Sequence, residues 1–170
     1  MLENIHDPHN VSAIFRTCDA VGIPKISLVY NEEKFPKIGK KSSASAYKWV
    51  EKEKFSHIGE CYRNLRNEGF TIYATALNPV SLNLYDLDFT KNIAIVLGNE
   101  HRGASDEAIN EADASLFIPM YGMVQSLNVS VATAVIIYEA LRQRKTACLY
   151  DKSFLSDSDL ENLINQYLKK

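Results

Sequence analysis

A stretch from residue 92 to residue 144 constrains the fold more than any other part of the sequence. It contains two short apolar runs, Ile93–Leu97 and Leu116–Ile118, and each run ends at a glycine-containing turn before a helical pattern begins. Short apolar strands that alternate with helices favour a parallel α/β fold. Ligands bind such sheets beyond the carboxyl ends of the strands. The sequence therefore predicts a binding site between the turns at 98–103 and 119–128.

The rest of the chain continues this alternation. Strands are predicted at residues 1–6, 26–30, 49–55 and 70–75, and helices at 57–67, 105–111, 129–144 and 156–168, with a further helix that starts near residue 10 and ends at Gly22. Either Asn10 or Ser12 is expected to cap that further helix, because both side chains can accept a hydrogen bond from an unpaired backbone N–H. Residues 82–88 are expected to form a connector with at most one helical turn.

The length of 170 residues predicts one domain, long enough to bury about two-thirds of its unfolded surface. We assign residues 1–150 to this domain and residues 151–170 to a C-terminal helix. Acidic residues fill the first turn of that helix, where they favour the helix dipole. Its apolar residues form one stripe: Leu160, Leu163, Ile164, Tyr167 and Leu168. The stripe favours a helix that docks on the domain or on a second copy of the chain over a disordered tail.

The composition narrows the class of protein. Hydrophobic residues make up 46% of the chain and charged residues 24%, which is typical of a globular protein and not of a disordered one. The net charge of −2 gives no overall attraction to nucleic acid, so contact with RNA requires a local basic patch. The sequence shows no leader in which charged residues are followed by an apolar run. No apolar run approaches the ~20 residues that a membrane span needs. A cytoplasmic location is therefore predicted.

The three cysteines, Cys18, Cys61 and Cys148, are scattered and show no C-x-x-C spacing. This pattern favours free thiols in a reducing compartment over a disulfide or a metal site. No metal is predicted.

Residues 34–47 are basic and rich in serine, and two interpretations of them remain open. Such a segment is most often a solvated surface loop. Lysines and hydroxyls are also the usual ligands of a nucleic-acid backbone, so Lys40 and Lys41 are candidate phosphate contacts.

Three strand-end loops carry motifs that together resemble one family. The first motif is Asn10-x-x-Ala13-x-x-Arg16 with Asp19-Ala20-Val21-Gly22, the second is Leu97-Gly98-Asn99-Glu100-x-x-Gly103, and the third runs from Ile118-Pro119-Met120 through Ser126-Leu127-Asn128 to Ala132. In this order they resemble the SpoU/TrmH-like ribose methyltransferases of the SPOUT superfamily. The start of the chain, with Leu2-Glu3-Asn4 before His9-Asn10, looks most like the bacterial tRNA guanosine 2′-O-methyltransferases that act on the D-loop.

This resemblance implies a mostly parallel sheet with helices on both faces and a C-terminal trefoil knot that holds S-adenosylmethionine. General rules of chain topology would not suggest a knot, because threaded chains are rare. The resemblance also implies a homodimer whose site is completed by the partner's segment 10–16. The family's cofactor contacts carry over to Thr75, Ala76, Leu77, Gly98, Glu100, Ile118, Met120, Ser126, Leu127 and Asn128.

These residues also fit the cofactor chemically. Adenine and a sulfonium need apolar walls with a few placed donors and acceptors, which Leu97, Ile118, Met120 and Leu127 can provide. Ser126 and Asn128 precede a predicted helix, whose free N–H groups bind carboxylate or phosphate.

The resemblance assigns catalytic roles to Asn10, Arg16, Glu100, Ser126 and Asn128. Arg16 is the central residue of this set, although it would otherwise be taken for a solvated helix arginine. Because a guanidinium stays protonated, we expect it to grip a phosphate and stabilise a developing alkoxide rather than act as a base. Asn10 could both cap a helix and orient Arg16. Glu100 could either order its loop or contact the partner's Asn10.

Contacts with RNA are expected from five residues: His9, Arg16, Lys40, Lys41 and Arg102. His9 and His101 are more often surface histidines than proton shuttles. Three functions remain in view. The first is transfer of a methyl group from S-adenosylmethionine to a ribose 2′-hydroxyl, in tRNA rather than ribosomal RNA. The others are a catalytically silent RNA-binding protein on the same fold and a doubly wound enzyme with another nucleotide cofactor. The absence of G-x-G-x-x-G and of a P-loop counts against the last.

Overall fold

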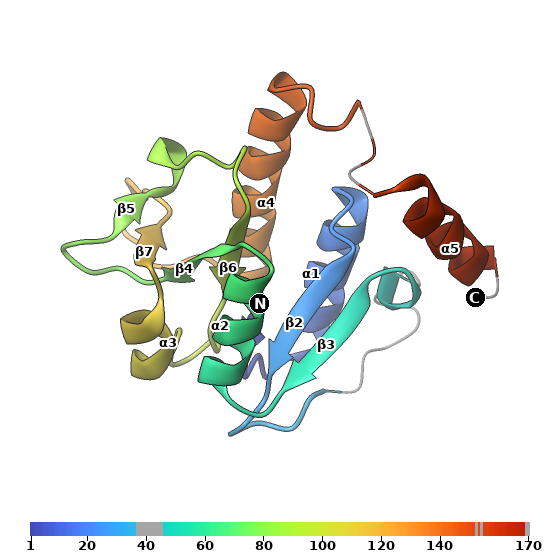
Figure 1. The fold of residues 1–170 in the computed structure, drawn as a ribbon. Helices are drawn as coiled ribbons and strands as arrows, with labels where there is room; N and C mark the ends of the chain where they lie inside the picture. The colour runs from blue at the N-terminus through green and yellow to red at the C-terminus, as the bar shows by residue number, and fades with distance from the viewer. Residues whose placement is uncertain (37–45, 152, 154, 169–170) are drawn as a thin grey trace.

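Two parallel sheets form the centre of the molecule (Figure 1). The computed structural model describes residues 1–36, 46–151, 153 and 155–168. The first sheet has the order β1-β2-β3 and contains β1 (Leu2–Glu3), β2 (Lys25–Val29) and β3 (Glu51–Phe55). The second has the order β5-β7-β4-β6 and contains β4 (Thr71–Thr75), β5 (Leu82–Asn83), β6 (Ile93–Val96) and β7 (Ala114–Phe117). All the strand pairs of these two sheets are parallel.

The two sheets meet where β1 lies beside the end of β6. The backbone N–H of Glu3 donates to the carbonyl of Leu97 at 2.9 Å, and the N–H of Leu97 donates to the carbonyl of Met1 at 3.1 Å. The strands therefore run in the order β5-β7-β4-β6-β1-β2-β3 across the molecule. This confirms the predicted parallel α/β construction.

Helices cover both faces of the sheet. They are α1 (Pro8–Ala20), α2 (Ile58–Asn67), α3 (Asp106–Glu111), α4 (Val129–Thr146) and α5 (Asp157–Leu168). One apolar core lies between the sheet and the pair α1 and α4, and a second lies between the sheet and α2 and α3. A strand that is buried on both faces must be apolar on both, which explains the unbroken apolar run in β6.

The start of α1 corrects the prediction for its cap. Asp7, and not Asn10 or Ser12, caps the helix, since its Oδ1 accepts from the N–H of His9 at 2.8 Å. The helix begins earlier than expected because the ring of Pro8 holds φ near the helical value and lacks the N–H that a first-turn residue leaves unpaired. Asn10 is therefore buried inside the first turn, and its side chain is available for tertiary contacts.

The other predicted elements are confirmed with small shifts at their ends, except that the strand predicted at residues 1–6 spans only Leu2–Glu3, since Asn4 at φ +50° ends it. The predicted connector at 82–88 holds one 3₁₀ turn, Leu84–Asp86, but also the short strand β5, which the prediction missed. A two-residue strand shows no periodicity that a sequence pattern could reveal. Another 3₁₀ turn, Ala46–Lys48, precedes β3.

The C-terminal helix α5 stands beside β3 and the 3₁₀ turn before it (Figure 1). The hydroxyl of Tyr167 donates to the carbonyl of Trp49 at 3.1 Å, and the two rings meet edge to face with centroids 5.3 Å apart. Ile164 and Leu168 from the predicted stripe remain 50% and 80% exposed. This contact joins the helix to the domain at one end of its stripe.

The three cysteines are free thiols, as predicted. Cys18 and Cys61 are buried, and burial raises the pKa of each to about 11. Cys148 is exposed. Within the described part of the chain, no helix is long and apolar enough to cross a membrane.

Candidate active site at the carboxyl edge of the sheet

Three neighbouring strands end at one edge, and the predicted site loops start there. Between β4 and β7, the N–H of Ala76 donates to the carbonyl of Leu116 at 3.0 Å. Between β4 and β6, the hydroxyl of Thr75 donates to the carbonyl of Val96 at 2.9 Å. The loops that begin at residues 76, 98 and 118 therefore leave the sheet side by side, and the predicted neighbourhood of the two turns is confirmed.

The turn 98–103 folds tightly over its own first residue. A Cβ at Gly98 would lie 2.0 Å from the backbone nitrogen of Ala104 and 2.2 Å from the carbonyl oxygen of Gly103. Gly103 has φ +74°, a conformation that side chains disfavour. The turn closes with the N–H of Gly103 donating to the carbonyl of Asn99 at 2.8 Å. Only glycine at position 98 permits this closure.

We expect Gly98→Ala to destabilise the folded chain by about 2 kcal/mol or more, since the added methyl group would overlap backbone atoms that cannot move aside. Denaturant unfolding measures this loss. The matched control is Gly122→Ala, because a Cβ at Gly122 meets no described atom within 4 Å. Equal stability of the two variants would contradict the overlap at Gly98.

A chain of side-chain hydrogen bonds connects three segments that are far apart in sequence. The Asn10 Nδ2 donates to Oε1 of Glu100 at 2.9 Å. The Oδ1 of the same Asn10 accepts from Nδ2 of Asn128 at 3.0 Å. Each of the three sequence motifs contributes one residue to this chain of hydrogen bonds. The bonds therefore hold together the first turn of α1, the turn 98–103 and the start of α4. We refer to these three residues as the Asn10–Glu100–Asn128 network.

The Glu100 carboxylate also accepts two backbone N–H groups. His6 donates at 2.9 Å and Asp7 at 3.0 Å. Burial alone would raise the pKa of Glu100, but the hydrogen bonds from Asn10, His6, Asp7 and its own N–H outweigh burial and hold the pKa below its ordinary value. Within one chain, Glu100 orders its loop against Asn10 and the backbone of residues 6 and 7, and a contact with the partner's Asn10 stays a prediction.

The lowered pKa of Glu100 has a consequence for stability at low pH. A carboxylate whose pKa is lower in the folded than in the unfolded state stabilises the fold above the unfolded pKa, about 4.3, and loses this contribution as pH falls through the folded pKa. We expect Glu100→Gln to melt below the wild-type chain at pH 7, and the gap to shrink as pH falls below about 4.3. Melting curves between pH 7 and pH 3 test this, with Glu51→Gln on exposed β3 as the control. If the difference in melting temperature between wild type and Glu100→Gln stayed constant down to pH 3, the stabilisation would not depend on the charge of Glu100.

Asn128 has a second role as the N-cap of α4. Its Oδ1 accepts from the N–H of Ser130 at 2.8 Å and from the N–H of Val131 at 3.4 Å. The side chain thus fixes the start of α4 through its oxygen and Asn10 through its nitrogen. The predicted placement of Asn128 at a helix N-terminus is confirmed, and Ser126 lies exposed just before it.

Three buried polar residues stabilise the segments that carry the network. None of them is predicted as a site residue from the sequence. The side chain of Asn4, at φ +50°, accepts from three successive N–H groups, those of residues 31, 32 and 33, each at 3.2 Å. Asn99 donates to the carbonyl of Asn4 at 2.7 Å, and Glu3 accepts from the N–H of Ser105 at 3.0 Å. A local run of polar residues inside the apolar strand start at 2–5 is the signal that could have indicated this support.

The predicted RNA contacts have different surroundings. Arg16 is exposed and makes no hydrogen bond or ion pair with any described residue. His9 is exposed in the first turn of α1. Arg102 is engaged by two carboxylates, Glu32 at 2.8 Å and Glu33 at 3.4 Å, which offset its charge. Lys40 and Lys41 lie outside the described residues, as does most of the predicted basic loop.

The apolar residues predicted to line the site differ in their exposure. Ile118 and Met120 are half-buried, whereas Leu77 is 68% exposed and Leu127 is 37% exposed. Such walls beside a capped helix N-terminus suit a ligand with a flat apolar part and a carboxylate. The polarity of these residues therefore fits S-adenosylmethionine, and their role in holding it stays a prediction.

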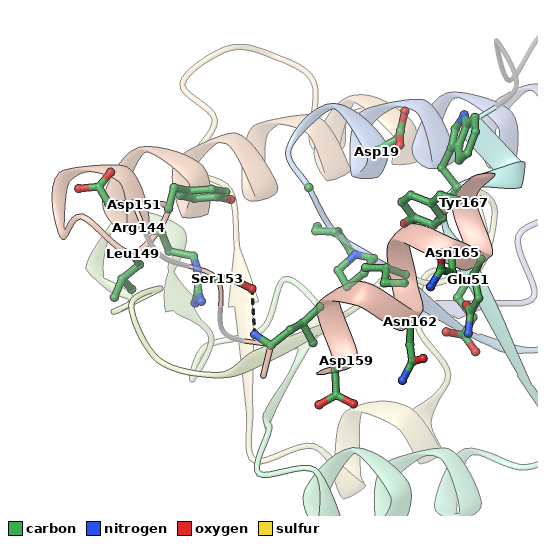
Figure 2. A pocket seen from close by; sticks show the side chains of 18 residues that line it. Asp19, Glu51, Arg144, Leu149, Asp151, Ser153, Asp159, Asn162, Asn165 and Tyr167 are labelled. Carbon is green, nitrogen blue, oxygen red and sulfur yellow. Dashed lines mark hydrogen bonds between the residues drawn. The ribbon is translucent and has the colours of Figure 1, made fainter. Parts of the chain in front are cut away.

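A large cavity of about 1240 Å³ lies elsewhere, between α5 and the opposite edge of the sheet (Figure 2). Its walls include Pro24 and Glu51, which stand at the amino ends of β2 and β3. Figure 2 shows the carboxylates of Asp19, Glu51 and Asp159 around it, with Arg144 at one end. Carboxylates repel phosphate, so this cavity is a poor candidate for an RNA contact. No group of three or more potential metal ligands occurs among the residues that the structure describes.

The parallel sheet, the tight turn at Gly98 and the network at one edge define an α/β domain whose candidate site lies at the carboxyl edge of its sheet. The comparisons identify its family. Residues 1–138 match the model of the SpoU rRNA Methylase family, and the chain belongs to this family of RNA methyltransferases. The predicted resemblance is confirmed.

Relatives and solved structures agree with this assignment. The chain is 45% identical over 170 residues to a tRNA (guanosine(18)-2′-O)-methyltransferase of Thermus thermophilus, covering 100% of this chain and 87% of the relative. The Aquifex aeolicus TrmH/SpoU tRNA modifying enzyme superposes with a TM-score of 0.91 at 41% identity, covering 99% of this chain and 86% of that one. The SpoU methyltransferase AviRb of Streptomyces viridochromogenes, in complex with its cofactor AdoMet, gives 0.73 at 25% identity, covering 85% and 59%.

Proposed function

We propose that this chain transfers a methyl group from S-adenosylmethionine to the ribose 2′-hydroxyl of a guanosine in the D-loop of tRNA. The observation that carries the proposal is the Asn10–Glu100–Asn128 network, which joins one residue of each family motif at the carboxyl edge of the sheet. The relatives named as tRNA guanosine-18 methyltransferases support tRNA as the substrate.

We assign the donor to the loops at residues 75–77, 98–100 and 118–128. The half-buried Ile118 and Met120 offer apolar surface to it. The positive end of the α4 helix dipole at Asn128 favours a carboxylate. When bound, S-adenosylmethionine supplies a methyl group already activated on a sulfonium sulfur. The remaining task of the protein is to position the ribose hydroxyl and favour loss of its proton, and positioning can contribute ~7–11 kcal/mol to such a reaction.

Arg16 is the group that we assign to the ribose and its phosphate. It is exposed and lacks a partner among the described residues, so its five N–H donors are free for an anion. A guanidinium held near the reacting oxygen stabilises the negative charge that develops on it. Asn10 and Glu100 then act as positioning residues, which fix the first turn of α1 against the turn 98–103.

The active form in this proposal is a homodimer in which Arg16 serves the donor site of the partner. Arg16 lies six positions after Asn10, which is about 240° around the helix and ~9 Å along it. Asn10 faces the network of its own chain, so Arg16 faces a different direction. Exposed apolar side chains support a covered surface, since the third motif and α4 carry six of them among the described residues: Tyr121, Met123, Val124, Leu127, Val131 and Tyr138.

The C-terminal trefoil knot belongs to the same proposal. The strand β7 pairs with both β4 and β5, although β4 and β5 follow each other directly in the sequence. A later strand thus lies between two earlier ones, and the chain continues from its end through residues 118–128 into α4. Strand order alone does not thread the chain, and the support for a threaded path is membership of the SpoU family and the TM-score of 0.91 to a TrmH/SpoU enzyme. We also propose residues 1–150 as the methyltransferase domain and residues 151–170 as a helix that docks on it, as the contact of Tyr167 with Trp49 supports.

Transfer from labelled S-adenosylmethionine tests the proposed function. The chain is incubated with tRNA and, separately, with ribosomal RNA, and the modified nucleotide is mapped. We expect label in a D-loop guanosine of tRNA, at its 2′-oxygen. Label confined to ribosomal RNA would show that the substrate is ribosomal RNA and not tRNA. Absence of label in both RNAs, with RNA still bound, would identify a catalytically silent RNA-binding protein.

A further inference from the structure

Arg102 lies in the turn 98–103 at the candidate site, but its guanidinium is bonded to two carboxylates of another loop. Its Nη1 lies 2.8 Å from Oε2 of Glu32, and its Nη2 lies 3.4 Å from Oε1 of Glu33. The two terminal nitrogens of one guanidinium therefore face oxygens of two different carboxylates. A phosphate group binds the same fork with two of its own oxygens. The two carboxylates thus occupy the positions that phosphate oxygens would take.

The backbone segments that carry this ion pair are both fixed to one buried residue, Asn4. The Oδ1 of Asn4 accepts from the N–H groups of residues 31, 32 and 33, each at 3.2 Å. On the other side, the carbonyl of Asn4 accepts from Nδ2 of Asn99 at 2.7 Å, and Oδ1 of Asn99 accepts from the N–H of Arg102 at 3.3 Å. Because both segments are attached to Asn4, the carboxylates and the guanidinium stay close together even when their side chains separate.

The side chains of the ion pair themselves remain in contact with water. Their exposed fractions are 54% for Arg102, 57% for Glu32 and 31% for Glu33. Such a pair contributes little to the free energy of unfolding, because water and salt screen it. The carboxylates can therefore be exchanged for another anion, and the fixed backbone allows the pair to form again afterwards.

The same three side chains set the charge of this part of the site. Two carboxylates face one guanidinium, so their charges do not cancel and the group is negative overall. Glu33 is held from a second side, since its Oε2 lies 3.3 Å from Nδ1 of His6. A phosphate that approaches Arg102 is repelled by both carboxylates until it displaces them.

We propose that Glu32 and Glu33 compete with RNA phosphate for Arg102 and thereby lower the affinity of the chain for RNA. Arg102 becomes a phosphate contact only when the RNA takes the place of both carboxylates. This inference rests on the proposed function, because RNA is the ligand that supplies the phosphate.

Titration of labelled tRNA with four forms of the chain tests the proposal. They are wild type, Glu32→Gln/Glu33→Gln, Arg102→Ala and the variant with all three changes, each measured over a range of salt concentrations. We expect Glu32→Gln/Glu33→Gln to bind tRNA more tightly than wild type by about fivefold or more. Its slope of log affinity against log salt should steepen by about one, since Arg102 then adds one phosphate contact. In the Arg102→Ala background the same two substitutions should tighten binding by no more than about twofold, because only screened repulsion is removed.

The matched control frees a different cation that two carboxylates also hold. Lys25, at the amino end of β2, lies 3.3 Å from Glu53 and 2.7 Å from Glu68. Glu53→Gln/Glu68→Gln changes the net charge by the same amount at a place remote from the carboxyl edge, and should alter tRNA affinity by no more than about twofold. An equal gain in this control, a full gain without Arg102, or no gain from Glu32→Gln/Glu33→Gln would each overturn the proposal.

Melting curves distinguish competition from a purely structural ion pair. Glu32→Gln/Glu33→Gln should melt within about 4 °C of wild type, since exposed pairs contribute little. A larger loss of stability without tighter binding would identify a structural pair and overturn the proposal. If none of the four forms binds RNA, the proposed function fails together with this inference. If tRNA binds but its affinity does not depend jointly on Arg102 and the two carboxylates, this inference alone fails.

Discussion

Arg16→Ala is expected to lower the rate of methyl transfer by at least ~10²–10³-fold, the range measured when one preorganised donor to a developing oxyanion is removed. Arg16 is exposed and has no described partner, so its loss should leave the fold and donor binding unchanged. The measurement is single-turnover transfer to tRNA together with calorimetric titration of S-adenosylmethionine. Arg63→Ala is the matched control and should keep wild-type activity, because Arg63 is an exposed residue of α2, which packs on the other face of the sheet.

Arg16→Lys separates charge from geometry. A lysine keeps the positive charge but lacks the planar pair of donors that binds a phosphate with two hydrogen bonds. We expect its rate to lie between those of wild type and Arg16→Ala. Near wild-type transfer by Arg16→Ala would show that another group holds the ribose, and the assignment of Arg16 would then be wrong.

Two inactive variants are expected to restore each other when they share a dimer. The first is Arg16→Ala. The second is Leu127→Trp, whose added bulk at a 37% exposed position should block the donor site without unfolding the chain. If Arg16 acts on the partner's donor, a mixed dimer contains one site with both changes and one site with neither. Equal co-expression yields half mixed dimers, so about a quarter of wild-type activity should appear from two nearly silent parents.

The matched control for complementation is a mixture of Arg16→Ala with Glu51→Gln, which changes neither part of the site. If Arg16 serves its own chain, the mixed dimer of the two inactive variants has no intact site, and activity would stay at the level of the parents. That outcome would place the whole site within one subunit. A monomer by sedimentation would exclude shared sites altogether.

The strand ends and their loops were predictable because they depend on local patterns. Apolar runs that stop at Gly98 and at Pro119 mark the carboxyl ends of β6 and β7, and parallel strands end at a common edge. Asn128 was correctly placed at a helix start for the same local reason. The family resemblance then joined the three loops in one site.

The cap of α1 was predicted wrongly because two local signals competed. Asn10 and Ser12 are good capping residues, but Asp7 and Pro8 come earlier, and a proline in the first helical turn decides where the helix begins. The shift matters for the site. If Asn10 were the N-cap, its side chain would accept hydrogen bonds from backbone N–H groups of the helix. It could then not bond to Glu100 and Asn128 as it does.

The support beneath the site could not be predicted from local pattern. Asn99 bonds to the carbonyl of Asn4, and Glu3 to the N–H of Ser105, across 95 and 102 positions in the sequence. Such contacts depend on how β1 inserts between β2 and β6. The ion pairs of Arg102 with Glu32 and Glu33 are equally non-local, and they reduce the free charge of a residue predicted to contact RNA.

The central claim is that the turn 98–103 and the loop 118–128 close around a sulfonium donor. Calorimetric titration with S-adenosylmethionine, combined with hydrogen exchange across the chain, tests it most directly. We expect one donor bound per chain, with slowed exchange in those two segments, and no binding by Leu127→Trp. Absence of heat and of protection in the wild-type chain, or protection confined to the cavity beside α5, would contradict the account.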